Sequence, residues 1–176
     1  MIPPIKLEYS AKFEKKGNRN FDAAAMTALA NLKVVAENCA KRILIRARAN
    51  IQDDGLIETG LLKKSLAVKS NVVRIRAEGG KGKYLGGRFY AIVGHDTAVV
   101  AEIDGKMIKP YKYSHLIEEG HRIVVARGKQ KGKVVGHDAE SYFYMSRAAN
   151  AEIEAIEESF AREAEKMFNA DLEYLK

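Results

Sequence analysis

The stretch AMTALANLKVVAENCAKRILIRA (residues 25–47) decides the fold, because its apolar residues recur at steps of three and four. This spacing predicts a helix from about residue 21 to residue 50, with Asn20 as its cap. A similar stripe predicts a second long helix from about residue 140 to 168. The apolar residues of that stripe are Met145, Ala149, Ile153, Ile156, Phe160, Ala164 and Met167.

Strands are expected between the two helices. Three segments there have the alternation or the turn boundaries of strands: residues 65–78, 89–93 and 97–103. Asp104-Gly105 is a hairpin signal, so residues 106–109 are expected to pair back. Tyr113 to Glu119 predict a short helix that Gly120 ends. Strands segregated between helices predict an α+β fold, with a central, mainly antiparallel sheet on which the long C-terminal helix packs.

Composition predicts one domain over residues 20–176, preceded by an extended or mobile arm over residues 1–19. The chain has 176 residues and 47% apolar content, enough to bury a core. It has no apolar run long enough to predict a membrane span, and its start lacks the apolar core of a secretion signal. Cys39 is the only cysteine, which predicts a buried small side chain in a reducing compartment.

Charge is distributed unevenly along the chain. Residues 140–176 contain four basic and nine acidic side chains, a balance of −5, so the other residues carry +12 within the total of +7. A basic body with an acidic final helix can bind a polyanion. It can equally stack against a copy of itself, basic face to acidic face. Charge alone leaves both possibilities open.

The four histidines are the residues most suited to catalysis or metal binding. Gly-His-Asp occurs twice, at His95 and His137, and a His-Asp pair can bind a metal or form a base with its orienting group. The same tripeptide is also ordinary turn material at the end of a strand. The spacing of a helical zinc site is absent, and no nucleophile motif accompanies Glu118, Glu119 and His121. We therefore predict no enzyme, no cofactor and no metal.

Two glycine-rich basic loops, residues 79–87 and 127–132, do not match a phosphate-binding loop, since Tyr84 follows Gly82-Lys83 where serine or threonine is required. We interpret them as contacts to neighbouring subunits or to DNA in a channel. The candidate residues are Lys81, Lys83, Arg88, Arg127, Lys129, Lys131 and Lys133.

Two short motifs flank the predicted strands. Thr59-Gly60-x-Leu62-x-x-Ser65 follows the first long helix, and Tyr113-Ser114-x-x-Ile117-Glu118-x-Gly120-His121 follows the strand set. In this order they resemble the tail-completion, or minor tail, proteins of long-tailed phages, a family also described as phage morphogenesis or head–tail joining proteins. The resemblance covers roughly residues 25 to 168, and Ser114 stands where the family usually has alanine.

The resemblance implies a structural virion protein located in the neck or at the top of the tail, assembled in the host cytoplasm. It would form a homo-oligomeric ring, with six subunits the expected number, between the connector or head-completion protein and the tail-tube or terminator protein. The motif residues would shape the fold and its interface, without contact to a membrane. The alternative is a small basic nucleic-acid-binding protein without sequence specificity, and the third possibility is a metal-dependent hydrolase using His95, His121 and His137.

Overall fold

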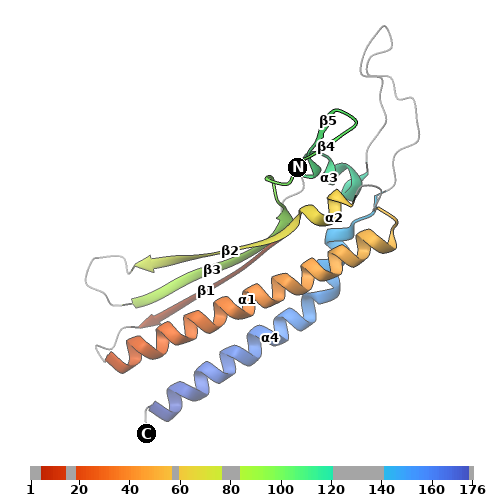
Figure 1. The fold of residues 1–176 in the computed structure, drawn as a ribbon. Helices are drawn as coiled ribbons and strands as arrows, with labels where there is room; N and C mark the ends of the chain where they lie inside the picture. The colour runs from red at the N-terminus through yellow and green to blue at the C-terminus, as the bar shows by residue number, and fades with distance from the viewer. Residues whose placement is uncertain (1–4, 15–18, 57–59, 77–83, 121–140, 175–176) are drawn as a thin grey trace. The chain divides into compact units, whose positions relative to one another are not determined.

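The computed structural model describes residues 5–14, 19–56, 60–76, 84–120 and 141–174 (Figure 1). Its architecture is α+β, as the sequence predicts, with two long helices and small antiparallel sheets. The chain folds as two compact units. The first unit comprises residues 44–67 and 94–150, and the second comprises residues 5–43, 68–93 and 151–176, in each case within the described ranges. Both long helices contribute residues to both units.

Helix α1 spans Arg19–Asp53 and confirms the predicted first helix, but Asn20 lies inside it and is not its cap. Its buried stripe is Leu32, Ala36, Cys39, Ala40, Ile43, Ala47 and Ile51. Cys39 is 2% exposed, which confirms its prediction as a buried side chain. The helix ends at the predicted Asp54-Gly55 turn, where Gly55 has φ 70°. Gly55 N–H donates to Gln52 O and Leu56 N–H to Ile51 O, the pair of bonds that closes a helix on a left-handed glycine.

The larger sheet lies mainly in the second unit, and one end each of β2 and β3 belongs to the first. Its strand order is β1-β3-β2, from Ile5–Glu14, Tyr84–His95 and Leu66–Arg76. Strand β1 pairs antiparallel with β3 in one unbroken register, from Ile5 opposite Val93 to Glu14 opposite Tyr84. The predicted N-terminal arm is therefore a strand of the sheet over these residues. Its sequence, IKLEYSAKFE, alternates strictly between apolar and polar residues, which is the signal of a half-buried strand.

Two further strand predictions need correction. Strand β3 begins at Tyr84, so the last residues of the predicted glycine-rich loop belong to the sheet. Residues 97–100 form no strand, and β4 contains only Ala101–Ile103. The predicted hairpin is confirmed, since β4 pairs antiparallel with β5, Lys106–Ile108, in the first unit. Asp104 and Gly105 have φ of 50° and 71°, the left-handed pair that a tight two-residue hairpin requires.

Two short helices lie in the first unit. Helix α2, Leu61–Ser65, was not expected from the sequence, and it follows Gly60, whose φ of 65° turns the chain. Helix α3, Pro110–Glu119, confirms the predicted short helix. It starts with proline, which has no N–H to leave unsatisfied, and it ends at Gly120 with φ 74° and ψ 171°. This conformation is essentially restricted to glycine.

The last helix, α4, spans Tyr144–Tyr174 and begins later than the predicted residue 140. In the first unit α4 contacts the end of α1. In the second unit Arg42 of α1 forms an ion pair with Glu152 of α4 at 2.7 Å, without the N–H alignment of a hydrogen bond to that oxygen. Helix α1 also contacts strand β2, because Ser70 donates a hydrogen bond to Glu37. None of the described helices combines the length and the hydropathy that a membrane span needs.

Candidate functional site

The described residues of the two sequence motifs lie in the first unit, on two helices that contact each other. Gly60, Leu62 and Ser65 lie at the start of α2 and along it, and Leu62 and Ser65 are buried. Tyr113 and Glu118 lie on α3, and Gly120 follows its last residue. Thr59 and His121 lie outside the described residues. The structure thus brings together two motifs that are about 50 residues apart in the sequence.

The predicted basic contact residues are placed differently. Arg88 lies on strand β3, opposite Ser10 of β1. The other six lie outside the described residues: Lys81, Lys83, Arg127, Lys129, Lys131 and Lys133. Their role at an interface or a DNA channel stays a prediction.

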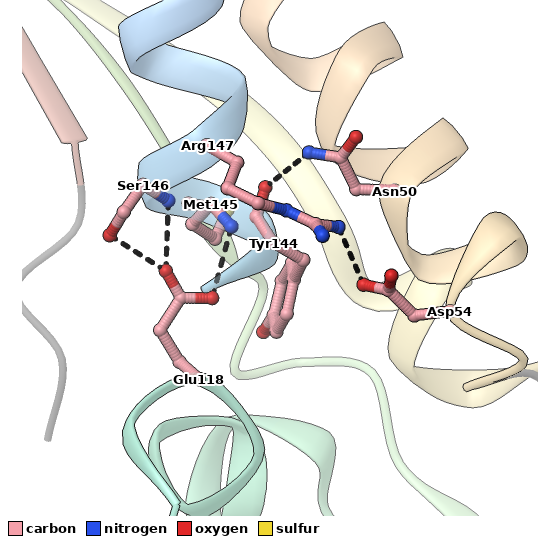
Figure 2. A network of polar contacts seen from close by, with 7 residues as sticks. All are labelled: Asn50, Asp54, Glu118, Tyr144, Met145, Ser146 and Arg147. Carbon is pink, nitrogen blue, oxygen red and sulfur yellow. Dashed lines mark hydrogen bonds and ion pairs between the residues drawn. The ribbon is translucent and has the colours of Figure 1, made fainter. Parts of the chain in front are cut away.

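Glu118 is the central residue of the motif cluster, and it caps the start of α4 (Figure 2). Its side chain is 1% exposed. One carboxylate oxygen accepts from Met145 N–H at 3.0 Å, and the other accepts from Ser146 N–H at 2.8 Å and from Ser146 Oγ–H at 2.9 Å. Phe143, the residue before the helix, has no side-chain oxygen to do this. Glu118 therefore supplies from α3 the acceptor and the negative charge that favour a helix N-terminus.

The end of α3 is satisfied by the same segment that leads into α4. Ser141 Oγ–H donates to Glu119 O, Tyr142 N–H to Ile117 O and Phe143 N–H to Glu118 O. A helix end leaves its last carbonyls without partners, and here three of them gain donors from residues just before the next helix. Phe143 meets this geometry with φ 48°, an uncommon conformation for a bulky side chain. We call these bonds, together with those of the Glu118 carboxylate, the capping network.

Two side chains at the end of α1 reach the first turn of α4 (Figure 2). Asn50 donates from its amide nitrogen to Tyr144 O at 2.8 Å. Asp54 pairs with Arg147, with the carboxylate oxygen 2.6 Å from a guanidinium nitrogen. Because Arg147 is 48% exposed, the ion pair is screened by solvent and contributes little. The part-buried hydrogen bond from Asn50 to the backbone is the more specific of the two.

A second line of hydrogen bonds runs through His95, and we call it the His95 chain. Tyr144 Oη is 2.6 Å from His95 Nε2, and Ser65 Oγ is 2.6 Å from His95 Nδ1. Ser65 uses its only proton to donate to Leu62 O at 2.8 Å. Ser65 Oγ must therefore accept from Nδ1–H, which leaves Nε2 to accept from Tyr144. Each group donates to the next in one direction, from Tyr144 to Leu62.

Burial shapes the protonation of this chain. It lowers the pKa of His95 to about 4, so the ring is neutral at pH 7, as the donor assignment requires. It also raises the pKa of Tyr144, and the nearby charges of Glu118 and Tyr113 add to that effect. A hydrogen bond from Ser114 partly opposes it. The phenol thus remains a neutral donor.

The polar groups of the His95 chain are engaged in hydrogen bonds within the protein. Ser65 is fully buried and its proton is engaged, so it is not poised as a nucleophile. Both ring nitrogens of His95 take part in hydrogen bonds, so neither is open to bind a metal. The first Gly-His-Asp closes strand β3, and Asp96 Oδ1 accepts from Ala98 N–H in the following turn. His121 and His137, the other members of the hydrolase alternative, lie outside the described residues.

Sequence reasoning missed Asn50, Tyr144 and Ser146 as partners of the motif residues. The place of Tyr144 beside His95 depends on residues 49 positions apart. The available signal was a tyrosine just before the apolar stripe that begins at Met145, since a phenol buried there requires a hydrogen-bond partner.

No protein-family model matches this chain, and comparison with the curated proteins and with the solved structures found no match. What the chain does is therefore inferred from its own residues and geometry.

Proposed function

We propose that this chain is a structural virion protein of a tailed phage, a neck or tail-completion subunit that forms a ring at the head–tail junction. The observation that carries the proposal is that the described, buried polar residues of the two motifs bond to the protein itself. Three of their described polar side chains, Ser65, Ser114 and Glu118, are buried in the first unit, and all the described hydrogen bonds of the Glu118 carboxylate are accepted from the first turn of α4. Residues bonded in this way stabilise the fold, and the stable fold provides a surface that other proteins can bind.

An assembly role accounts for this pattern better than catalysis does. A catalytic group must contact a substrate, yet Ser65 and Glu118 are at most 1% exposed. Several large apolar side chains lie on the surface instead, including Met107 at 62% and Phe143 at 47% exposure. Exposed aromatic and methionine side chains are enriched in protein interfaces. The described surface thus favours contact with protein.

In the assembled particle we propose a homo-oligomeric ring of six subunits. One face of the ring would bind the connector or head-completion protein, and the other the tail-tube or terminator protein. The two glycine-rich basic loops predicted from the sequence, residues 79–87 and 127–132, would bind a neighbour or line the channel through which DNA passes. An uneven charge distribution suits head-to-tail contacts between identical subunits, because a basic surface can meet an acidic one.

Two measurements test this function. Immunogold labelling of phage particles with an antibody against the chain should place gold at the head–tail junction. Cryo-electron microscopy of the purified protein should show closed rings. Phage particles that lack the chain at every position along the portal-to-tail axis would refute the proposal.

A non-specific nucleic-acid-binding protein is the second candidate, and the exposed Lys41, Arg42 and Arg46 on α1, with the net charge of +7, favour it. An isolated monomer would then bind short duplex DNA, with an affinity that falls steeply as salt rises. Under the assembly proposal, free monomer binds DNA weakly and replacing Lys129, Lys131 and Lys133 by alanine impairs head–tail joining. Replacing the exposed Lys64, Lys106 and Lys112 by alanine removes the same charge and serves as the matched control.

A further inference from the structure

The outer face of α4 in the second unit is acidic. Glu154, Glu157, Glu158 and Glu165 are all exposed and, with the exposed Ala161, follow helical spacing along one side. Ile153, which is 52% exposed, lies at the edge of the same face. The nearby cations Arg162 and Lys166 lie toward the flank, where Lys166 pairs with Glu163. We call this surface the α4 face.

The outer face of α1 in the same unit has the opposite character. Val34, Asn38 and Lys41 are exposed at helical spacing, and Val34 is 52% exposed. Glu37 lies at the flank, where Ser70 and Lys33 bind it and lower its pKa. Arg42, on the other flank, keeps 47% of its side chain exposed while it pairs with Glu152. The exposed part of this surface, the α1 face, therefore carries positive charge and a valine.

We propose that the α1 face of one copy binds the α4 face of the next copy. This rests on the ring of the proposed function and identifies its subunit contact. The two faces have opposite charge, and each exposes one large aliphatic side chain, Val34 or Ile153, that the contact would cover. Since the faces lie on different helices, the contact joins unlike surfaces, as a closed ring requires.

A second copy is the occupant that the charges favour. The α4 face repels nucleic acid and other acidic surfaces. The rest of this basic chain attracts the α4 face of another copy. Within one copy Arg42 pairs with Glu152, which places Lys41 of α1 at the level of Ile153 on α4. If the rotation axis of the ring is parallel to these helices, each residue lies at the same height along the axis in every copy. Lys41 would then meet Glu154 and Glu157, while Val34 would meet the small residues Ala161 and Ala164.

The test reverses the charge on each face. The α4 variant Glu154→Lys/Glu157→Lys and the α1 variant Lys41→Glu should each raise the ring dissociation constant at least about tenfold in mass photometry, because like charges then meet at every contact. Combining all three substitutions should restore rings, since the pairing is then reversed. The control Glu102→Lys/Glu119→Lys changes the net charge as the α4 variant does, at exposed residues of the first unit, and should leave rings intact. Circular dichroism should show all variants folded.

The outcomes separate the subunit contact from the proposed function. Rings that survive the α4 reversal, or reversals whose combination fails to restore rings, overturn the contact while the ring itself stands. A wild-type protein that forms only closed dimers also overturns the contact. A wild-type protein that remains monomeric at every concentration, together with particles that lack the chain, overturns the proposed function.

Discussion

The two units of this chain hold their helices together in different ways. In the first unit the start of α4 is bound by directional polar contacts, from Glu118 to two backbone N–H groups and from Asn50 to Tyr144 O. In the second unit α4 contributes the buried Ile156 and an ion pair, and its outer side carries glutamates. The first arrangement defines where the helix begins and which way it points. The arrangement in the second unit holds the helix by its inner side, and the outer side remains free to carry charged residues.

This difference separates the residues that maintain the fold from those available for assembly. The motif side chains that the structure describes lie in the first unit, where a buried acceptor such as Glu118 tolerates little change. Exposed residues on the outer faces of the second unit, such as Val34 and Glu154, can be substituted while the buried stripe of α1 stays intact. Stability measurements on the two units therefore have different expected outcomes.

The largest expected effect concerns packing in the second unit. Leu32 is fully buried on α1, and Leu32→Ala should lower the free energy of unfolding by about 3–4 kcal/mol, because a cavity remains where the side chain was. Val34→Ala, two residues along the same helix, should cost less than about 1 kcal/mol, since Val34 is half exposed. Urea denaturation measures both. Equal effects would contradict the assignment of the buried stripe.

Removal of the Glu118 carboxylate should come next. Glu118→Ala leaves two buried N–H groups without their acceptor, so the expected loss is about 3 kcal/mol in the free energy of unfolding. Glu118→Gln keeps one acceptor oxygen and should lose about half as much. Glu119→Ala, at the exposed neighbour, is the control and should change stability by less than about 0.5 kcal/mol. A loss of about 3 kcal/mol in the Glu119→Ala control as well would mean that any substitution at the end of α3 destabilises the protein, and would contradict the specific role of Glu118.

A pH titration tests the His95 chain. Because the folded-state pKa of His95 is about 4 and its ordinary value is 6.5, the unfolded state binds more protons between these values. The stability from neutral His95 is complete above pH 6.5 and is lost as pH falls toward 4. The loss should reach about 2 kcal/mol at pH 5. In His95→Gln this part of the pH dependence should vanish, as urea denaturation at pH 7 and pH 5 would show.

The smallest effects compare the two ion pairs between α1 and α4. Arg147→Ala, in the first unit, should cost about 0.5 kcal/mol, because its partner Asp54 keeps 15% of its side chain exposed and water can replace the lost contact. Arg42→Ala, in the second unit, should cost about 1.5 kcal/mol, because it leaves a carboxylate that is only 9% exposed. Thermal denaturation of both variants at low and high salt checks the order. A larger loss for Arg147 would reverse the comparison.

The long helices were predictable because their signals are local. The period of α1 and the stop at Gly55 are contained in the residues themselves, and so is the Asp104-Gly105 hairpin. Strand β1 was missed, although its alternation was present, because two prolines precede it and its partner strand lies some 80 residues away.

The start of α4 could not be predicted from nearby residues. Its acceptor, Glu118, comes from another helix, and the bonds from Tyr142 and Phe143 to α3 keep these residues out of the helix. The His95 chain likewise depends on Ser65, His95 and Tyr144 meeting in space. A sequence indicates that such polar residues matter through their buried neighbourhood, but the pairing itself comes from the tertiary fold.

The reactivity of the buried Cys39 thiol can be used to measure how often the helices separate. The thiol is 2% exposed, and burial raises its pKa, which keeps it in the less reactive protonated form. A maleimide can modify it only while the second unit is transiently open. The labelling rate of the unmodified protein, followed by mass spectrometry, therefore measures how often α1 and α4 separate. Slower labelling at higher protein concentration would indicate that assembly suppresses that separation.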